Sequence, residues 1–277
     1  MNCEKVFNYL VDELSNYLTK NNLKAMVLGI SGGIDSTVVA AICYEVEKKT
    51  GVPLIGRSLP SKYNKEGETT TAELVGKAFC SPWNFEIKSI QDLYENTIGN
   101  LGEVDGKSRT ALANGNVQAR LRMIVLYDIA SQLGGIVMDT DNKTEHNLGY
   151  FTLHGDQGDY APMRELWKTE VYKLAQFIRD FKCDTNEQKI AINESCALTP
   201  TAGLGITDSD LEELGAPSYM IVDCVLKSTV IEGDRDRDNI EMLCGKEVTD
   251  NIIKRHKASE FKRKGLPVYP EISDFDK

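Results

Sequence analysis

The sequence contains 277 residues, of which 41% are hydrophobic and 27% charged, a balance typical of a soluble globular protein. Its formal net charge of −10 argues against broad nucleic-acid binding, which requires a basic surface. It has no apolar run as long as a membrane span and no signal-peptide pattern at its start, so we expect a cytoplasmic protein that does not enter the membrane.

The first half of the chain alternates short apolar runs with amphipathic stretches. Residues 3–20 have apolar side chains at helical spacing, whereas 25–30 (AMVLGI) predict a buried parallel strand followed by a Gly-rich turn at 31–36. The pattern continues with strands at 52–59 and 84–90 and helices at 37–47, 65–79 and 91–98. The alternation predicts a doubly wound, mainly parallel α/β sheet flanked by helices, in a single domain over 1–277.

The second half is more helical and more polar. Residues 99–114 are rich in Gly and polar side chains and predict a loop, and 116–133 predict a long amphipathic helix. The rest is predicted as a strand at 135–139, irregular chain at 149–167, a helix at 168–181, an insertion or mobile loop at 182–198, and helices and loops from 199 onward.

The Gly-rich turn SGGIDS is the strongest candidate site. A loop between a buried strand and a helix presents unpaired N–H groups and a partial positive charge to an anion. Gly32 and Gly33 let the backbone approach a phosphate closely, and Ser31 and Ser36 add hydroxyl donors. Asp35 fits this position if Mg²⁺ lies between its carboxylate and the phosphates.

A different interpretation of the same turn is a hydrolase nucleophile. Residues 29–33 fit G-x-S-x-G, the strand–helix elbow of α/β-hydrolases, with Ser31 as nucleophile and His256 as a distant partner. No HGG-type oxyanion segment precedes the turn, and this interpretation gives Asp35 and Ser36 no role. The phosphate interpretation is therefore favoured.

The string SGGIDS resembles the pyrophosphate loop of the ATP-pyrophosphatase family, and further motifs resemble its NAD synthetase branch. These motifs are NGNVQARLRMIVLY at 114–127, the segment 139–168, TPTAG at 199–203 and SEFKR at 259–263. The resemblance implies an adenine nucleotide alpha hydrolase-like fold. Departures are Asp139 where the motif has Gly, an altered segment at 207–215, and Phe261-Lys262 in place of a His-Lys pair.

The resemblance also implies a reaction. In this family the nicotinate carboxylate of deamido-NAD attacks the α-phosphorus of ATP, which releases pyrophosphate, and ammonia then displaces AMP from the acyl adenylate. Because the synthetase-like helix begins near residue 3, we expect no N-terminal glutaminase domain and free ammonia as nitrogen donor. The family forms homodimers, so we expect a homodimer. Another ligase with the same loop and a non-catalytic nucleotide-binding module remain as alternatives.

The candidate residues fall into four overlapping sets: catalytic, metal-binding, ATP-binding and deamido-NAD-binding. Asp35 and Lys168 are expected to be catalytic, with Lys168 as a mobile cation at a helix start, and Asp35 and Glu145 are expected to hold Mg²⁺. Asn116 and Arg120 lie four apart, so one helix face presents both. The resemblance places Arg57 and Thr140 near ATP and Asn116 and Arg120 near deamido-NAD. With these, the full expected ATP set is Ser31, Gly32, Gly33, Asp35, Ser36, Arg57, Thr140 and Lys168, and the expected deamido-NAD set is Asn116, Arg120, Tyr127, Asp156, Asp159 and Lys262.

Overall fold

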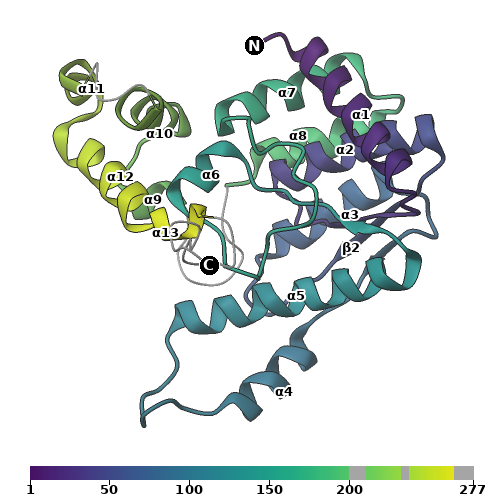
Figure 1. Cartoon of the computed structure of the whole chain (residues 1–277), viewed down its shortest axis with the longest axis horizontal. Helices are drawn as coiled ribbons and strands as arrows, with labels where there is room; N and C mark the ends of the chain where they lie inside the picture. Colours follow the sequence, from purple (N-terminus) through teal and green to yellow (C-terminus); the bar gives the residue numbers. More distant parts are fainter. Residues whose placement is uncertain (200–209, 232–236, 265–277) are drawn as a thin grey trace, which may run out of the picture.

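The protein is built on a four-stranded parallel sheet. The computed structural model describes residues 1–199, 210–231 and 237–264 (Figure 1). The strands are β1 (Met26–Gly29), β2 (Leu54–Ser58), β3 (Phe85–Ile87) and β4 (Ile136–Val137), in the order β3-β2-β1-β4. All three pairings are parallel. The predicted doubly wound α/β fold is confirmed, with strands shorter than the sequence ranges.

The central strand β1 sends alternate side chains into two different cores. Met26 and Leu28 pack on one face among the helices α1 (Cys3–Lys20), α2 (Ile34–Thr50) and α3 (Glu66–Phe79). Val27 packs on the other face against α5 (Ala111–Leu133). Because strand side chains alternate, a strand covered on both faces is apolar throughout, which explains the continuous run in the sequence.

Helix ends follow local signals in the sequence. The helix α5 begins at Ala111, five residues before the predicted start, because Thr110 accepts a hydrogen bond from the Ala113 N–H as its N-cap. It ends at Gly134, which has the left-handed conformation common after helices. The end of the predicted 99–114 loop was therefore wrong. The helix α4 (Gln91–Leu101) precedes this loop.

The segment 182–198 is helical, which corrects the predicted insertion or mobile loop. Residues Asn186–Ala197 form α8, capped by Thr185, whose hydroxyl accepts the Gln188 N–H in a capping box. The helix packs against α2, α3 and α7 (Lys168–Phe181). Ala191 and Ile192 are buried there, so α8 is part of the main core.

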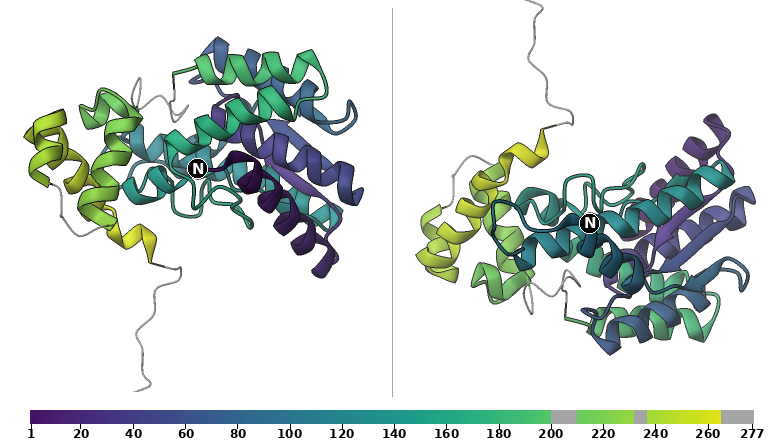
Figure 2. Two further views of the ribbon diagram at one scale, coloured as in Figure 1. Left: turned by 90° about the horizontal axis from the view of Figure 1, so that it is seen from above. Right: turned by 90° about the horizontal axis from the view of Figure 1, so that it is seen from below.

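A third core, about as small as the one beside α5, joins the C-terminal helices to the sheet region. It lies among α6 (Lys143–Leu148), α10 (Tyr219–Val225), the π-helix η1 (Leu226–Ile231) and α12 (Lys246–Ala258). The helices α9 (Asp210–Leu214), α11 (Arg237–Cys244) and α13 (Glu260–Arg263) complete this layer, which stands to one side of the sheet in both views of Figure 2. Among the described residues, no helix is long and apolar enough to cross a bilayer.

Candidate active site

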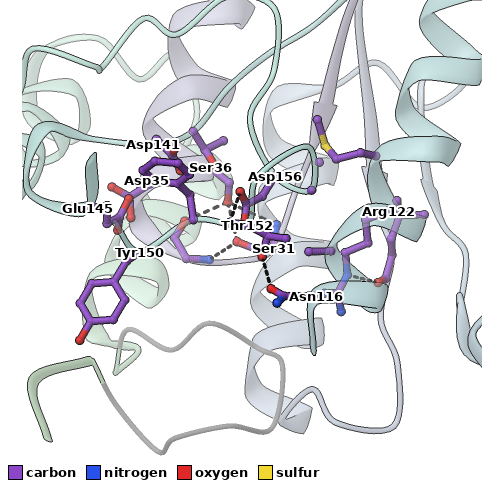
Figure 3. A pocket seen from close by; sticks show the side chains of 18 of the residues that line it. Ser31, Asp35, Ser36, Asn116, Arg122, Asp141, Glu145, Tyr150, Thr152 and Asp156 are labelled. Carbon is purple, nitrogen blue, oxygen red and sulfur yellow. Dashed lines mark hydrogen bonds between the residues drawn. The ribbon is translucent and has the colours of Figure 1, made fainter. Parts of the chain in front are cut away.

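A cleft of about 920 Å³ opens at the carboxyl ends of the strands, between the sheet and the C-terminal helices. This is the edge at which open parallel sheets bind ligands, and the volume suits a nucleotide-sized molecule. Figure 3 shows that the side chains lining it come from the loop after β1, from α5 and from the chain that follows β4.

The Gly-rich turn forms one wall of this cleft. Gly33 is the N-cap of α2, and the helix therefore begins at Ile34 without a side-chain cap. The Ser31 and Ser36 hydroxyl oxygens lie 3.1 Å apart, and Ser36 donates to the Gly33 carbonyl at 3.0 Å. Ser31 accepts the Gly33 N–H at 3.2 Å. The start of α2 thus presents its N–H groups to the cleft beside two hydroxyl groups, as an anion site requires.

Gly32 fixes the path of this turn. Its φ of 89° lies in the left-handed region that side chains disfavour. A Cβ built at this position would lie 2.5 Å from the Glu68 carbonyl oxygen and 2.8 Å from the Ala72 nitrogen, both on the backbone of α3. Gly32 is therefore required because the loop packs directly on the neighbouring helix.

Lys168 is buried between two carboxylates, which corrects the expectation of a mobile cation. Only 1% of the residue is exposed. Its Nζ bonds to Asp35 Oδ2 and lies 2.9 Å from Glu145 Oε1. Burial alone lowers the pKa of Lys168, but the two carboxylates outweigh it, and the pKa is raised well above its ordinary value. Lys168 is therefore a fixed ammonium.

A capping box sets the position of Glu145. Asn142 is the N-cap of α6, its side-chain oxygen accepts the Glu145 N–H at 3.0 Å, and the Glu145 carboxylate accepts the Asn142 N–H at 3.3 Å. The Asn142 amide also donates to Asp35 Oδ1 at 2.8 Å. One local motif, N-x-x-E, thus places Glu145 against Asp35, which is more than 100 residues earlier.

The start of α7 is held by a residue from the C-terminal layer. The backbone N–H of Lys168 donates to the Thr144 hydroxyl at 2.9 Å, and that hydroxyl donates to Asp223. Asp223 also accepts from the Thr169 N–H at 2.9 Å. A carboxylate at a helix N-terminus is favourable for the helix dipole, and here it also joins α6, α7 and α10.

The donor set around Lys168 fits a magnesium ion bound together with phosphates. The Asp35 and Glu145 carboxylates converge on one position, which the positively charged Lys168 ammonium occupies. Among the described residues, no group of three or more His, Cys, Asp or Glu side chains is placed to hold a metal. Mg²⁺ usually takes one or two carboxylates and completes its shell with water and substrate phosphates, so two carboxylates suffice.

The predicted ATP residues outside the loop also reach the cleft. Thr140 lines it directly. Arg57 lines it as well, but its guanidinium donates to the Gly56 and Asn84 carbonyl oxygens at 2.7 and 3.0 Å. Arg57 is thus held along the sheet edge.

The predicted deamido-NAD residues of α5 divide between two clefts. Asn116 lines the main cleft, where its side chain accepts from the Thr152 hydroxyl at 2.8 Å. Arg120 and Tyr127 line a second cleft of about 780 Å³, which also contains basic side chains. Arg120 donates to the Leu153 carbonyl at 3.1 Å. Residues four apart on a helix point in directions that differ by about 40°. Asn116 and Arg120 therefore lie on either side of the wall that separates the two clefts.

The remaining predicted residues have well-defined partners. Tyr127 donates to Asp159 at 2.9 Å, and Asp159 in turn accepts the Val137 N–H at 2.9 Å. Burial and this bond raise the pKa of Tyr127 to about 12. Asp159 lines neither cleft, and its carboxylate links α5 to β4 through these two hydrogen bonds. Lys262 lines both clefts and donates to the Gly149 carbonyl at 2.7 Å.

Asp156 lies in the main cleft beside Thr152, whose N–H donates to both of its carboxylate oxygens at 2.8 and 3.0 Å. Burial raises the pKa of Asp156 to about 7. This carboxyl therefore titrates near neutral pH.

Two cleft residues were missed by the sequence reasoning. Arg122 lines the main cleft and donates to the Leu59 carbonyl and the Asn64 side chain, both at 3.0 Å. Burial lowers the pKa of its guanidinium to about 10. Asp141 also lines the cleft. Both residues lie inside the motif segments quoted above. The direction in which each side chain points, however, depends on the register of α5 for Arg122 and on the turn after β4 for Asp141.

The structure does not support the hydrolase interpretation. Ser31 bonds within the phosphate loop, whereas His256 Nδ1 lies 2.9 Å from the Asn147 carbonyl oxygen and its ring contacts Arg263. Ser31 and His256 therefore do not form a nucleophile–base pair. Residues 200–203 of the TPTAG segment and residues 207–209 of the altered segment lie outside the described residues.

The fold and the loop together define a class, the α/β proteins that bind nucleotide phosphates at a glycine-rich PP-loop. The NAD synthase family model matches residues 6–266. The NH(3)-dependent NAD(+) synthetase of Pyrococcus furiosus is 33% identical over 99% of this chain and 97% of its own length. The chain belongs to the NAD synthase family.

Other relatives agree with this assignment. The structure of NMN synthetase from Francisella tularensis has a TM-score of 0.78 at 28% identity, covering 98% of this chain and 99% of that one. The structure of NH3-dependent NAD synthetase from Campylobacter jejuni has a TM-score of 0.74 at 22% identity, covering 98% and 100%, and supports the fold alone. The Glutamine-dependent NAD(+) synthetase of Aquifex aeolicus is 28% identical over 98% of this chain but only 46% of its own length.

Proposed function

We propose that this protein is an ammonia-dependent NAD synthetase, which uses ATP and ammonia to convert deamido-NAD to NAD with release of AMP and pyrophosphate. The observation that carries the assignment is the convergence of Lys168, Asp35 and Glu145 beside the uncapped start of α2. This arrangement suits phosphate chemistry because charge develops on the departing pyrophosphate. Family membership supplies the substrate.

In the first step, an oxygen of the nicotinate carboxylate bonds to the α-phosphorus, and the bond from that phosphorus to pyrophosphate breaks. We assign the pyrophosphate to the N–H groups at the start of α2 and to the Ser31 and Ser36 hydroxyl groups. Lys168 compensates its charge. Arg57 and Thr140 are proposed as further ATP contacts at the sheet edge. Because these donors are fixed before substrate binds, they need little rearrangement as the bond breaks.

Asp35 and Glu145 are proposed as the protein ligands of Mg²⁺. The ion supplies charge neutralisation between two approaching anions. The ion would share these two carboxylates with the Lys168 ammonium, which contacts both of them in the structure.

In the second step, the ammonia nitrogen bonds to the acyl carbon, and the bond to AMP breaks. We propose that Asn116 and Asp156 line the nicotinate end of the substrate and that Arg120, Tyr127 and Lys262 line its outer part in the second cleft. The Asp159 carboxylate positions Tyr127. We further propose that the chain acts as one domain, as a homodimer, in the cytoplasm.

The mononucleotide analogue of deamido-NAD is a second candidate substrate, because the structure of an NMN synthetase covers nearly the whole chain at 28% identity. In the decisive assay, the protein is incubated with ATP, Mg²⁺ and ammonium, and with either deamido-NAD or its mononucleotide analogue. Equal amounts of NAD, AMP and pyrophosphate from deamido-NAD are expected. A large preference for the mononucleotide would reassign the substrate, and no ATP cleavage with either acid would refute the proposed function. Light scattering tests the homodimer, and cell fractionation tests the location.

A further inference from the structure

The second cleft concentrates positive charge. Its charged lining residues, within the described part of the chain, are Arg120, Lys262, Arg263 and Lys264, and no Asp or Glu is among the lining residues. Three of these cations are held by backbone carbonyl groups and form no ion pair with a described carboxylate: Arg120, Lys262 and Arg263. In a chain with a net charge of −10, this local field favours an anionic occupant.

His146 on α6 also lines this cleft, and its hydrogen bond defines its tautomer. The Nδ1 atom of His146 lies 2.7 Å from Nη1 of Arg164. A guanidinium group has N–H donors and no acceptor, so Nδ1 must accept this hydrogen bond and carries no proton. The ring is therefore neutral, and its single N–H is at Nε2.

Two contacts fix the direction of the His146 ring. One face is stacked on Phe151, with the ring centroids 5.8 Å apart and the planes 10° from parallel. The Nδ1 edge is held by Arg164. Neither Phe151 nor Arg164 borders the second cleft, so the Nε2 edge is the part of the ring left to face it. Within the described part of the chain, Nε2 has no hydrogen-bond acceptor of its own.

Arg164 is itself fixed by Asp139, the residue that stands where the motif has Gly. Its Nη2 donates to Asp139 Oδ2 at 2.9 Å. Asp139 is only 1% exposed, and it also accepts the Asp141 N–H at 2.7 Å and the Gly158 N–H at 3.0 Å. This buried carboxylate orients Arg164, and Arg164 orients the His146 ring. A glycine at position 139 has no side chain to provide this support.

We propose that His146 is a substrate-binding residue, whose Nε2–H donates to a phosphate oxygen of the nicotinic acid nucleotide in the second cleft. Arg164 and Asp139 are its positioning residues. The proposal rests on the proposed function, which assigns the outer part of deamido-NAD to this cleft. A neutral donor suits this position because it gives direction to phosphate binding without adding repulsion among the cations. Deamido-NAD and its mononucleotide analogue both carry such a phosphate.

The first test compares His146→Ala with His146→Gln, which keeps an N–H donor near the position of Nε2. The control is Glu165→Gln, which changes an exposed carboxylate next to Arg164 in sequence. The KM for deamido-NAD should rise about 10- to 100-fold in His146→Ala, the usual effect of losing a hydrogen bond to a charged group. It should stay within about 3-fold of the wild-type value in the other two variants. The kcat and the KM values for ATP and ammonium should not change.

The second test uses nicotinic acid riboside, which lacks the phosphate. As a competitive inhibitor against deamido-NAD, it should have the same inhibition constant in the wild type and in His146→Ala. The mononucleotide carries the phosphate and should bind about 10- to 100-fold more weakly to the variant. Equal weakening of both ligands would overturn the phosphate contact, and so would an unchanged KM for deamido-NAD in His146→Ala.

Nitrogen-15 NMR of histidine-labelled protein tests the positioning by Arg164. The His146 signals are identified by their loss in His146→Gln, and in the free wild type the proton should be on Nε2. In Arg164→Met the ring loses the partner that selects this tautomer, so both tautomers should be populated and the KM for deamido-NAD should rise. A proton on Nδ1 in the wild type would overturn the positioning, a result that does not depend on whether the Arg164 variant folds.

Failure of the proposed function looks different from failure of this inference. In that case the wild type itself would form no NAD from deamido-NAD, ATP and ammonium. An active wild type whose KM for deamido-NAD is shared by His146→Ala would overturn the role of His146 alone.

Discussion

The replacement Lys168→Met tests whether the buried ammonium holds the active site together. Methionine has nearly the same length and keeps the packing, but it leaves Asp35 and Glu145 facing each other without the cation between them. Removing one partner of a buried ion pair costs about 3–5 kcal/mol, because the remaining charge stays buried.

The expected cost lies at the lower end of that range. The Asp35 and Glu145 side chains are 16% and 17% exposed, so water reaches them in part. We therefore expect a loss of about 3 kcal/mol of unfolding free energy. For a protein of this size, that loss corresponds to a Tm lowered by about 6–12 °C. Pyrophosphate release should fall at least about 100-fold, because a donor to the developing charge is gone.

Urea unfolding and calorimetry, each with and without Mg²⁺, measure this effect. The divalent ion should restore part of the lost stability in the variant, because it fills the position between the two carboxylates. The wild type without nucleotide should respond little. The control is Lys49→Met, which removes an exposed ion pair to Asp12 and should cost less than about 1 kcal/mol. A Lys168→Met variant as stable as the control, or one that Mg²⁺ does not stabilise more than the wild type, would refute the reasoning.

Three other perturbations follow from the structure. Gly32→Ala should destabilise the protein by about 2 kcal/mol in urea and abolish pyrophosphate release, because its Cβ meets the backbone of α3; normal release would contradict the close approach. Asp139→Gly restores the motif residue but removes the hydrogen bonds of Asp139 with the Asp141 N–H, the Gly158 N–H and Arg164. Urea unfolding should therefore show a loss of about 3 kcal/mol of unfolding free energy, and an unchanged midpoint would be evidence against this structural role of Asp139. The pKa of Asp156 is raised from 3.8 to about 7, so the stabilisation linked to its proton is full below pH 3.8 and disappears as the pH rises through about 7. The Tm advantage of Asp156→Asn over the wild type should therefore grow across that window, and a constant difference would exclude the shift.

The fold class and the phosphate loop were predictable because their signals are local. An apolar run that ends in SGGIDS specifies a buried strand, a turn that needs Gly32, and a helix start, all within a dozen residues. The order of strands and helices then follows from their alternation. Helix α7 was predicted with its observed bounds for the same reason.

The surroundings of α8 and Lys168 were not predictable in this way. The buried face of α8 includes polar residues whose partners are distant, such as Ser195, 2.7 Å from the Thr37 hydroxyl, and Gln188, which donates to the Ala78 carbonyl at 3.2 Å. Composition alone therefore suggested a loop, although T-x-x-Q was a usable capping signal. A lysine in the first turn of a helix is usually solvated, and the burial of Lys168 depends on carboxylates 133 and 23 residues away in sequence.

Asp223 gives the C-terminal layer an influence on the reaction that its distance along the chain does not suggest. It anchors the helices that carry Lys168 and Glu145, yet it lies on α10, beside the small core among α6, α10, η1 and α12 rather than in the large core on one face of the sheet. Regions with less buried apolar surface open at lower free energy than the rest of a protein. Partial unfolding of this layer alone would release the charged cluster while the parallel sheet stays intact. On warming, turnover would then stop before the sheet melts, so the thermal limit of the enzyme would be set by the layer of α6, α10, η1 and α12 and not by the sheet.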